Sequence, residues 1–144
     1  MTAALQQPAQ PGTGPFQVEW ADDKIVTIVD LGSVAREGGQ GAVVSFTVRK
    51  EPLAGTTAIM TKRSHVFDCA SGVDESEMVW AYDASGRRLN FIPVGKDILS
   101  PAITQDPSTP AAFNLACHGT ALTGARNADY HALVQAWRAG SPRP

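Results

Sequence analysis

The sequence predicts a mostly β protein of the α+β class, with an antiparallel meander of about five to six strands, a short helix and a C-terminal amphipathic helix. Short runs that alternate apolar and polar residues, or that collect β-branched residues, follow one another between residues 16 and 94. Turns rich in Gly, Asp and Ser separate these runs. Helical spacing of apolar residues is clear only near the C-terminus.

The first four strands are expected at residues 16–20, 25–29, 42–50 and 56–69. Residues 22–24 make the first turn. Residues 31–34 either end the second strand or form a short turn, and the glycines of residues 36–41 permit the positive φ angles of a loop. The second and third strands are therefore predicted to form a hairpin.

Two further strands are expected at residues 77–82 and 88–94. The short connection at residues 83–86 contains a glycine, which favours a hairpin between them. Because successive antiparallel strands joined by short connections lie side by side, the chain is predicted to form a meander.

A short helix is expected at residues 110–117, started by Pro110 and capped by Thr109. The second helix is expected to begin at Asn127 and to stop at Gly140. Its apolar stripe either covers a sheet face or packs against a partner, and it consists of Tyr130, Leu133, Val134 and Trp137.

The chain of 144 residues has room for one domain, predicted to span residues 16–140. Residues 1–15, rich in Pro and Gln, are expected to form a disordered tether, and residues 141–144 a disordered tail. A proline-punctuated loop is expected at residues 96–110.

The net charge is −2 and the isoelectric point is near 5.8, so no basic field exists to attract nucleic acid. No stretch approaches the roughly 18 apolar residues of a transmembrane helix, and the N-terminus has neither the basic nor the apolar region of a signal peptide. The chain is either cytoplasmic or an exported protein whose signal a starting Met has replaced. We favour export, because Gln- and Pro-rich tethers often follow a cleaved signal.

The sequence contains no complete motif of a metal site or of a catalytic serine. His65, His118 and His131 lack the spacings of metal ligands, and we expect three ordinary surface or half-buried histidines. The serines beside glycines do not complete GxSxG and are interpreted as turn residues; they are Ser33, Ser71 and Ser85. The acidic residues of predicted turns, including Asp74, are interpreted as solvated. We therefore predict no catalytic, cofactor or metal site.

Two basic pairs are candidate contacts. Lys62 with Arg63, and Arg87 with Arg88, either form a small positive patch for an acidic ligand or protect an exposed strand from aggregation.

Cys69 and Cys117 leave three alternatives open. They form a disulfide that closes a long loop, they remain buried free thiols, or they bind a metal, for which a second CxxC or a nearby His pair is missing.

Several features in order resemble the bacterial surface-adhesin protein E family. They are Trp20 on an early strand, the run Ile28-Val-Asp-Leu31 followed by Ser33-Val34, the strand ending Ser64-His-Val-Phe-Asp68-Cys69, the Tyr82 to Gly86 hairpin, and Pro101 ahead of a helical stretch leading to Cys117. The resemblance implies an antiparallel sheet packed with helix, a Cys69–Cys117 disulfide, and export or lipid anchoring. Founding members of the family bind host matrix proteins.

This chain departs from the family at two places. Ala70-Ser-Gly72 replaces basic residues that often follow the Asp-Cys pair, and the helix around Tyr130 extends beyond the usual end.

The function expected from these observations is a non-catalytic, exported domain of the periplasm or cell surface that binds a protein partner. Its candidate contact residues are Tyr130, Leu133, Val134, Trp137, Lys62, Arg63, Arg87 and Arg88. The alternative is a structural or accessory subunit of an envelope assembly, for example a homodimer formed through a sheet edge. A third hypothesis, ranked behind both, is a small-molecule binder or weak hydrolase that uses His65 or His118.

Overall fold

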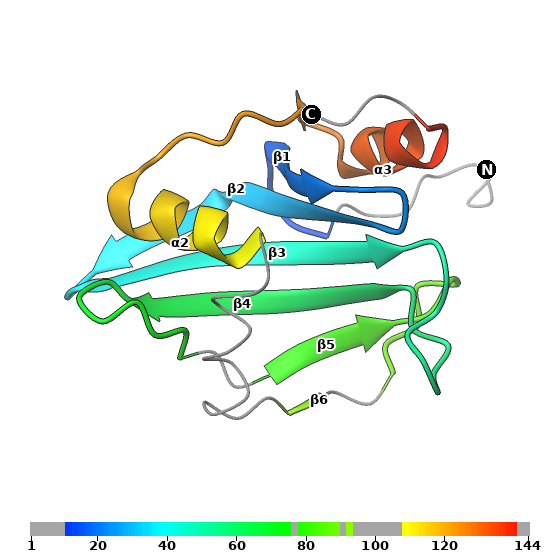
Figure 1. Ribbon diagram of the computed structural model, residues 1–144, viewed down its shortest axis with the longest axis horizontal. Coiled ribbons are helices and arrows are strands. Elements are labelled where there is room, and N and C mark those ends of the chain that lie inside the picture. The colour runs from blue at the N-terminus through cyan, green and yellow to red at the C-terminus, as the bar shows by residue number, and fades with distance from the viewer. Residues whose placement is uncertain (1–10, 76–77, 90–91, 94–107, 141–144) are drawn as a thin grey trace, which may run out of the picture.

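The computed structural model describes residues 11–75, 78–89, 92–93 and 108–140, which form one open sheet and two helices (Figure 1). This arrangement confirms the predicted α+β, mostly β class. The strands are β1 (Phe16–Ala21), β2 (Ile25–Glu37), β3 (Gln40–Arg49), β4 (Met60–Asp68), β5 (Met78–Tyr82), β6 (Ile92–Pro93) and β7 (Arg126–Asn127). The helices are α2 (Ser108–His118) and α3 (Tyr130–Arg138).

Every strand pairing in the sheet is antiparallel, and the strand order is β6-β5-β4-β3-β2-β1-β7. The first six strands thus form the predicted meander. The seventh, β7, was not predicted. It returns to the opposite edge and pairs with β1, where the Gln17 side chain donates hydrogen bonds to the carbonyls of Leu122 and Gly124. This return carries the chain from α2 to α3.

Strand β2 is longer than predicted, because residues 31–34 form a bulge instead of ending it. Four residues of β2 bulge between the pairs Asp30–Val44 and Ala35–Ala42, and the Ser33 hydroxyl accepts a hydrogen bond from the Val44 N–H at 2.8 Å. A side chain thus satisfies a backbone group that the ladder cannot reach.

The turn after β2 is also tighter than the predicted loop at residues 36–41. Gly38 and Gly39 have φ values of 60° and 80°, the pair of positive angles that a type I′ turn requires. Because two glycines supply the turn, both strands continue up to it.

Asp30 attaches the start of the described chain to the sheet. Its buried carboxylate accepts hydrogen bonds from the N–H groups of Thr13, Gly14 and Gly32 at 3.1, 2.9 and 2.9 Å. Residues 11–15, which we assigned to the disordered tether, are therefore part of the ordered domain. The rest of the predicted tether, residues 1–10, and the predicted tail, residues 141–144, lie outside the described residues.

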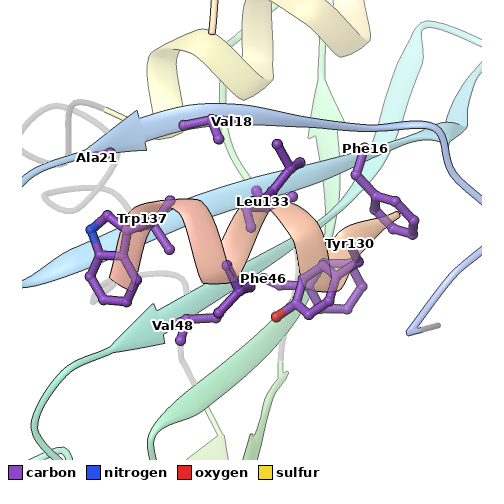
Figure 2. Packing of buried hydrophobic residues seen from close by; sticks show 11 residues of the cluster. Phe16, Val18, Ala21, Phe46, Val48, Tyr130, Leu133 and Trp137 are labelled. Carbon is purple, nitrogen blue, oxygen red and sulfur yellow. The ribbon is translucent and has the colours of Figure 1, made fainter. Parts of the chain in front are cut away.

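Helix α3 covers one face of the sheet over β1, β2 and β3. Figure 2 shows its side chains gathered with Phe16, Val18 and Phe46 in one apolar cluster. The edge of the Tyr130 ring packs against Phe16 and Phe46, with ring centroids 5.6 and 5.5 Å apart. The Trp137 indole N–H donates to the Asp22 carbonyl at 2.7 Å.

Helix α2 covers the opposite face, where Val29, Val43 and Phe67 form a second cluster with Ala112, Leu115 and Ala116. The two clusters alternate along the strands, as in the neighbouring residues Val43 and Val44 of β3. Because successive side chains of a strand point to opposite faces, the sheet has a core on both sides.

The helix ends differ from the predicted ones. Asp129, not Asn127, caps α3, and its carboxylate accepts the N–H of His131. The amide oxygen of Asn127 accepts the N–H of Asp129 just before the helix.

Helix α2 begins at Ser108, so Pro110 lies inside the first turn, where a missing N–H costs nothing, and Thr109 is helical instead of a cap. The predicted stop at Gly140 is confirmed by its φ of 80°.

Other boundaries differ as well. Strand β4 begins at Met60 instead of residue 56. Of the predicted sixth strand, 88–94, the structure describes β6 at Ile92–Pro93 and an isolated bridge between Arg88 and Tyr82, and residues 90, 91 and 94 lie outside the described residues. The predicted loop at residues 96–110 lies outside the described residues up to residue 107.

Candidate functional site

A groove runs beside α3, on the part of the sheet that this helix leaves uncovered. Its volume is about 630 Å³, within the range of about 300–1,000 Å³ typical of ligand sites. We call it the α3 groove. It is lined by Pro11, Phe46, Val48, Ile59, Met60, Lys62, Tyr82, Asp83, Ala84, Ser85, Gly86, Tyr130, His131, Val134, Gln135 and Arg138.

The groove exists because α3 is short and covers only one side of a wide sheet. Nine residues make a helix about 13.5 Å long. Phe46, Val48 and Met60 on β3 and β4 form an apolar floor next to the helix. The turn after β5, residues 82–86, forms the opposite wall, so the floor lies between a helix and a turn.

Two cations line this apolar floor. Lys62 is half-buried on β4, and Arg138 is exposed at the last residue of α3. Within the described part of the chain, neither side chain forms an ion pair with a carboxylate. The guanidinium of Arg138 instead lies 5.9 Å from the centre of the Trp137 ring.

Asp83 is the acidic residue of the lining, and its carboxylate is hydrogen-bonded within the turn that contains it. Its carboxylate accepts hydrogen bonds from the Ser85 hydroxyl at 2.6 Å and from the N–H groups of Ser85 and Arg87, both at 3.0 Å. The Ser85 hydroxyl is the main cause that holds the pKa of Asp83 below its ordinary value of 3.8. The acid therefore organises the wall and does not neutralise the two cations.

Two polar groups of α3 adjoin the groove floor. Burial raises the pKa of the Tyr130 hydroxyl well above its ordinary value, so this residue is neutral at any physiological pH. The neighbouring His131 Nε2 is buried and has no hydrogen-bond partner among the described residues. No motif in the sequence distinguishes His131 from the other two histidines.

A second constellation lies inside the sheet, on the α2 side. The Ser45 hydroxyl is 3.0 Å from His65 Nε2, and His65 Nδ1 is 2.7 Å from an oxygen of Asp74. The exposed fractions are 5%, 4% and 0% for Ser45, His65 and Asp74. The sequence predicts that His65 and Asp74 lie near solvent, and the structure corrects this prediction. Both side chains are buried, and the Asp74 carboxylate has a hydrogen-bond partner in His65.

The order serine, histidine, aspartate matches that of a nucleophile, a base and an orienting acid. The surroundings do not match a hydrolase. Strand β3 pairs with β2 and β4 on its two sides, and the N–H of Val44, next to Ser45, donates to the Ser33 hydroxyl, so these groups already have partners within the sheet. None of the three residues lines the α3 groove. Their arrangement fastens residues 69–75 to β4, with the His65 ring stacked on Phe67 at 5.1 Å.

The predicted contact residues separate into different environments. Tyr130, Leu133, Val134 and Trp137 are 5–9% exposed, because their stripe covers the sheet. This is the first of the two uses expected for the stripe, and it leaves little of these side chains for a partner. Tyr130 and Val134 nevertheless line the α3 groove, as does Lys62.

The four cations of the two basic pairs have different neighbours. Lys62 and Arg63 are adjacent on β4 and point to opposite faces. Arg63 lies 3.8 Å from the buried Asp74. Arg87 pairs with Asp83 at 3.2 Å, and the guanidinium of Arg88 lies 4.7 Å from the centre of the Trp80 ring.

Cys69 and Cys117 form a disulfide, with their Cα atoms 5.5 Å apart. This confirms the bridge that the resemblance implied. The bond joins the end of β4 to the last turn of α2. Gly41 permits this approach, because a Cβ at that position would lie 2.7 Å from the Ala116 carbonyl oxygen and 2.9 Å from Cys117 Sγ.

Among the described residues, no group of three or more His, Cys, Asp or Glu side chains is placed to hold a metal ion. No helix in the same part of the chain has the length and apolarity to cross a membrane.

Comparisons with known proteins add no relative. No family model matches the chain, and neither a curated protein nor a solved structure matches it.

Proposed function

We propose that this chain is a non-catalytic, exported domain that binds a protein partner, and that the α3 groove receives a segment of that partner. The observation that carries this proposal is a groove of about 630 Å³ with an apolar floor. Two cations line it, and neither has a carboxylate partner in the described chain. Recognition sites commonly combine such a floor with a few polar groups that orient the ligand.

The proposed location is the periplasm or the cell surface. A disulfide between residues 48 positions apart supports it, since structural disulfides persist mainly in oxidising compartments. The resemblance to the surface-adhesin protein E family points in the same direction, because its members are exported or lipid-anchored.

The alternatives have less support. A homodimer through a sheet edge would use β6 or β7, and within the described residues each of these edge strands is two residues long. Short edge strands are a common protection against edge pairing. A small-molecule site or hydrolase centred on His65 or His118 gains no support from the α3 groove, because neither residue lines it.

A random peptide library displayed on phage would test the proposal. The library is selected against the folded, oxidised chain, and each selected peptide is then measured against two variants. Gln135→Trp places an indole at the groove from an exposed position of α3. Ala136→Trp is the matched control, because it adds the same ring to the next exposed position, which does not line the groove.

We expect peptides that lose binding at least about tenfold in Gln135→Trp, a change of about 1.4 kcal/mol, and less than about twofold in Ala136→Trp. Unfolding curves of both variants would verify that each is folded. Selected peptides that bind both variants as tightly as the parent chain would show that the groove is not the binding site.

A further inference from the structure

We infer that the α3 groove selects an acidic segment: a short stretch of about four extended residues that places an apolar side chain on the floor and a carboxylate against Lys62 and Arg138. This inference rests on the proposed function and names the chemistry of the partner. It follows from the charges that line the groove, the partners of each charge, and the length of helix α3 beside the groove.

The charges of the lining are unequal. Lys62 and Arg138 contribute two positive charges, and Asp83 contributes one negative charge. Asp83 is itself compensated, because the Arg87 side chain lies 3.2 Å from its second oxygen. The groove therefore carries an excess of positive charge, although the whole chain carries a net charge of −2.

The positive charges lie beside an apolar floor, which sets the second requirement. Lys62 faces the same side of the sheet as its register partners Phe46 on β3 and Trp80 on β5. A carboxylate placed there is partly shielded from water, so its attraction to an ammonium group is stronger than at an open surface. A segment with an acid next to an apolar or aromatic residue satisfies both features at once.

The length of the bound segment follows from the length of helix α3, which borders the groove. Helix α3 is about 13.5 Å long, and extended chain rises about 3.3 Å per residue, so about four residues lie alongside it. A basic segment would place like charges together, and a wholly apolar segment would leave Lys62 partly buried without a partner.

The test uses the groove-dependent peptides from the library, resynthesised, with affinities measured by fluorescence polarisation. Each acid of a peptide is replaced by its amide, Asp by Asn or Glu by Gln. The protein variants are Arg138→Glu and Lys62→Met, the latter keeping most of the aliphatic stem while removing the charge. Arg126→Glu is the control, since Arg126 is an exposed cation that does not line the groove.

We expect the amide peptides to bind about fivefold more weakly, and Lys62→Met and Arg138→Glu each to weaken binding by about three- to tenfold. Arg126→Glu should change the affinity less than about twofold. Raising the ionic strength from 0.05 to 0.5 M should weaken the parent complex and have a smaller effect on Lys62→Met.

Groove-dependent peptides that are neutral or basic, or whose affinity survives both protein variants, would overturn the acidic-segment inference and leave the proposed function standing. Peptides that bind without depending on the groove, or a library that yields no binder, would overturn both. The Gln135→Trp result therefore separates the two failures.

Discussion

His65 Nδ1 lies 2.7 Å from a carboxylate oxygen of Asp74, and the two side chains are among the least exposed polar groups of the sheet. The carboxylate comes from the segment after β4, nine positions along the chain from the histidine. This contact, continued to Ser45 on β3, ties an irregular segment to two central strands. It has the composition of a catalytic triad, and its three members lie outside the α3 groove, where they connect β3, β4 and the segment after β4.

The first prediction concerns this buried chain. Asp74→Ala should lower the free energy of unfolding by about 3 kcal/mol, because it leaves His65 and Arg63 without their buried acid. Ser45→Ala removes one neutral hydrogen bond and should cost about 1 kcal/mol. Urea unfolding followed by circular dichroism measures both values. Equal effects of Asp74→Ala and of the exposed Asp23→Ala would contradict this role.

The second prediction concerns the disulfide. Replacing both cysteines by serine should lower the free energy of unfolding by about 4 kcal/mol, because the bridge closes a loop of 48 residues in the unfolded chain. Intact-mass analysis of the parent chain, with alkylation before and after reduction, should show no modified thiol until reductant is added. Two alkylated thiols in unreduced protein from an oxidising compartment would contradict the bridge.

The third prediction concerns the contact between β3 and α2. Gly41→Ala should destabilise the domain by about 1–3 kcal/mol, since the new Cβ meets the helix backbone and the disulfide. Gly38→Asn, in the same hairpin, is the control: its Cβ meets open space, and Asn tolerates a positive φ. Thermal unfolding should separate the two variants, and a larger loss for Gly38→Asn would contradict the proposed packing.

The fourth prediction decides between the two uses of the α3 stripe. Trp137→Ala should cost about 4 kcal/mol of unfolding free energy, because the indole fills the core beneath the helix. Trp137→Phe retains much of the ring contact and should cost less, since its main loss is the hydrogen bond to the Asp22 carbonyl. A Trp137→Ala variant as stable as the exposed Gln135→Ala would show that the stripe does not hold the core.

The fifth prediction concerns acid. Hydrogen bonds lower the pKa values of Asp22, Asp68 and Asp83 below 3.8, chiefly from the Ile25 N–H, the Ala70 N–H and the Ser85 hydroxyl respectively. Between the folded and unfolded pKa values the unfolded chain binds more protons, so this contribution to stability is present above the unfolded value and is lost as pH falls through the folded value.

Urea unfolding at a series of pH values between about 5 and 2 should therefore show decreasing stability. Replacing all three aspartates by asparagine should flatten this dependence. A triple variant with the same pH dependence as the parent chain would show that these carboxylates do not cause it.

The meander could be predicted from the sequence because its determinants are local. Alternation along β1 and β3 identifies a strand whatever it pairs with, and the helical spacing from Tyr130 to Trp137 does the same for α3. The connections between these strands are too short for the crossover that parallel strands need. Consecutive strands are therefore expected to pair side by side and antiparallel.

Features that depend on distant partners were missed or misassigned. The bulge of β2 depends on a hydroxyl that replaces a ladder hydrogen bond, and β7 exists because β1 has an open edge that two residues can occupy. The cap of α3 moved from Asn127 to Asp129, since both residue types cap helices and packing chose between them.

Periodicity and turn chemistry act over a few residues, so the strands, the amphipathic helix and their order could be predicted from the sequence. Which side chains meet depends on residues far apart in the chain, so it follows from the folded arrangement. The buried carboxylate of Asp74 has His65 as its partner, and the apolar stripe of α3 covers the sheet because β1 to β3 present an apolar face. The α3 groove arises where a nine-residue helix ends against a wider sheet, a mismatch of dimensions that no single segment contains.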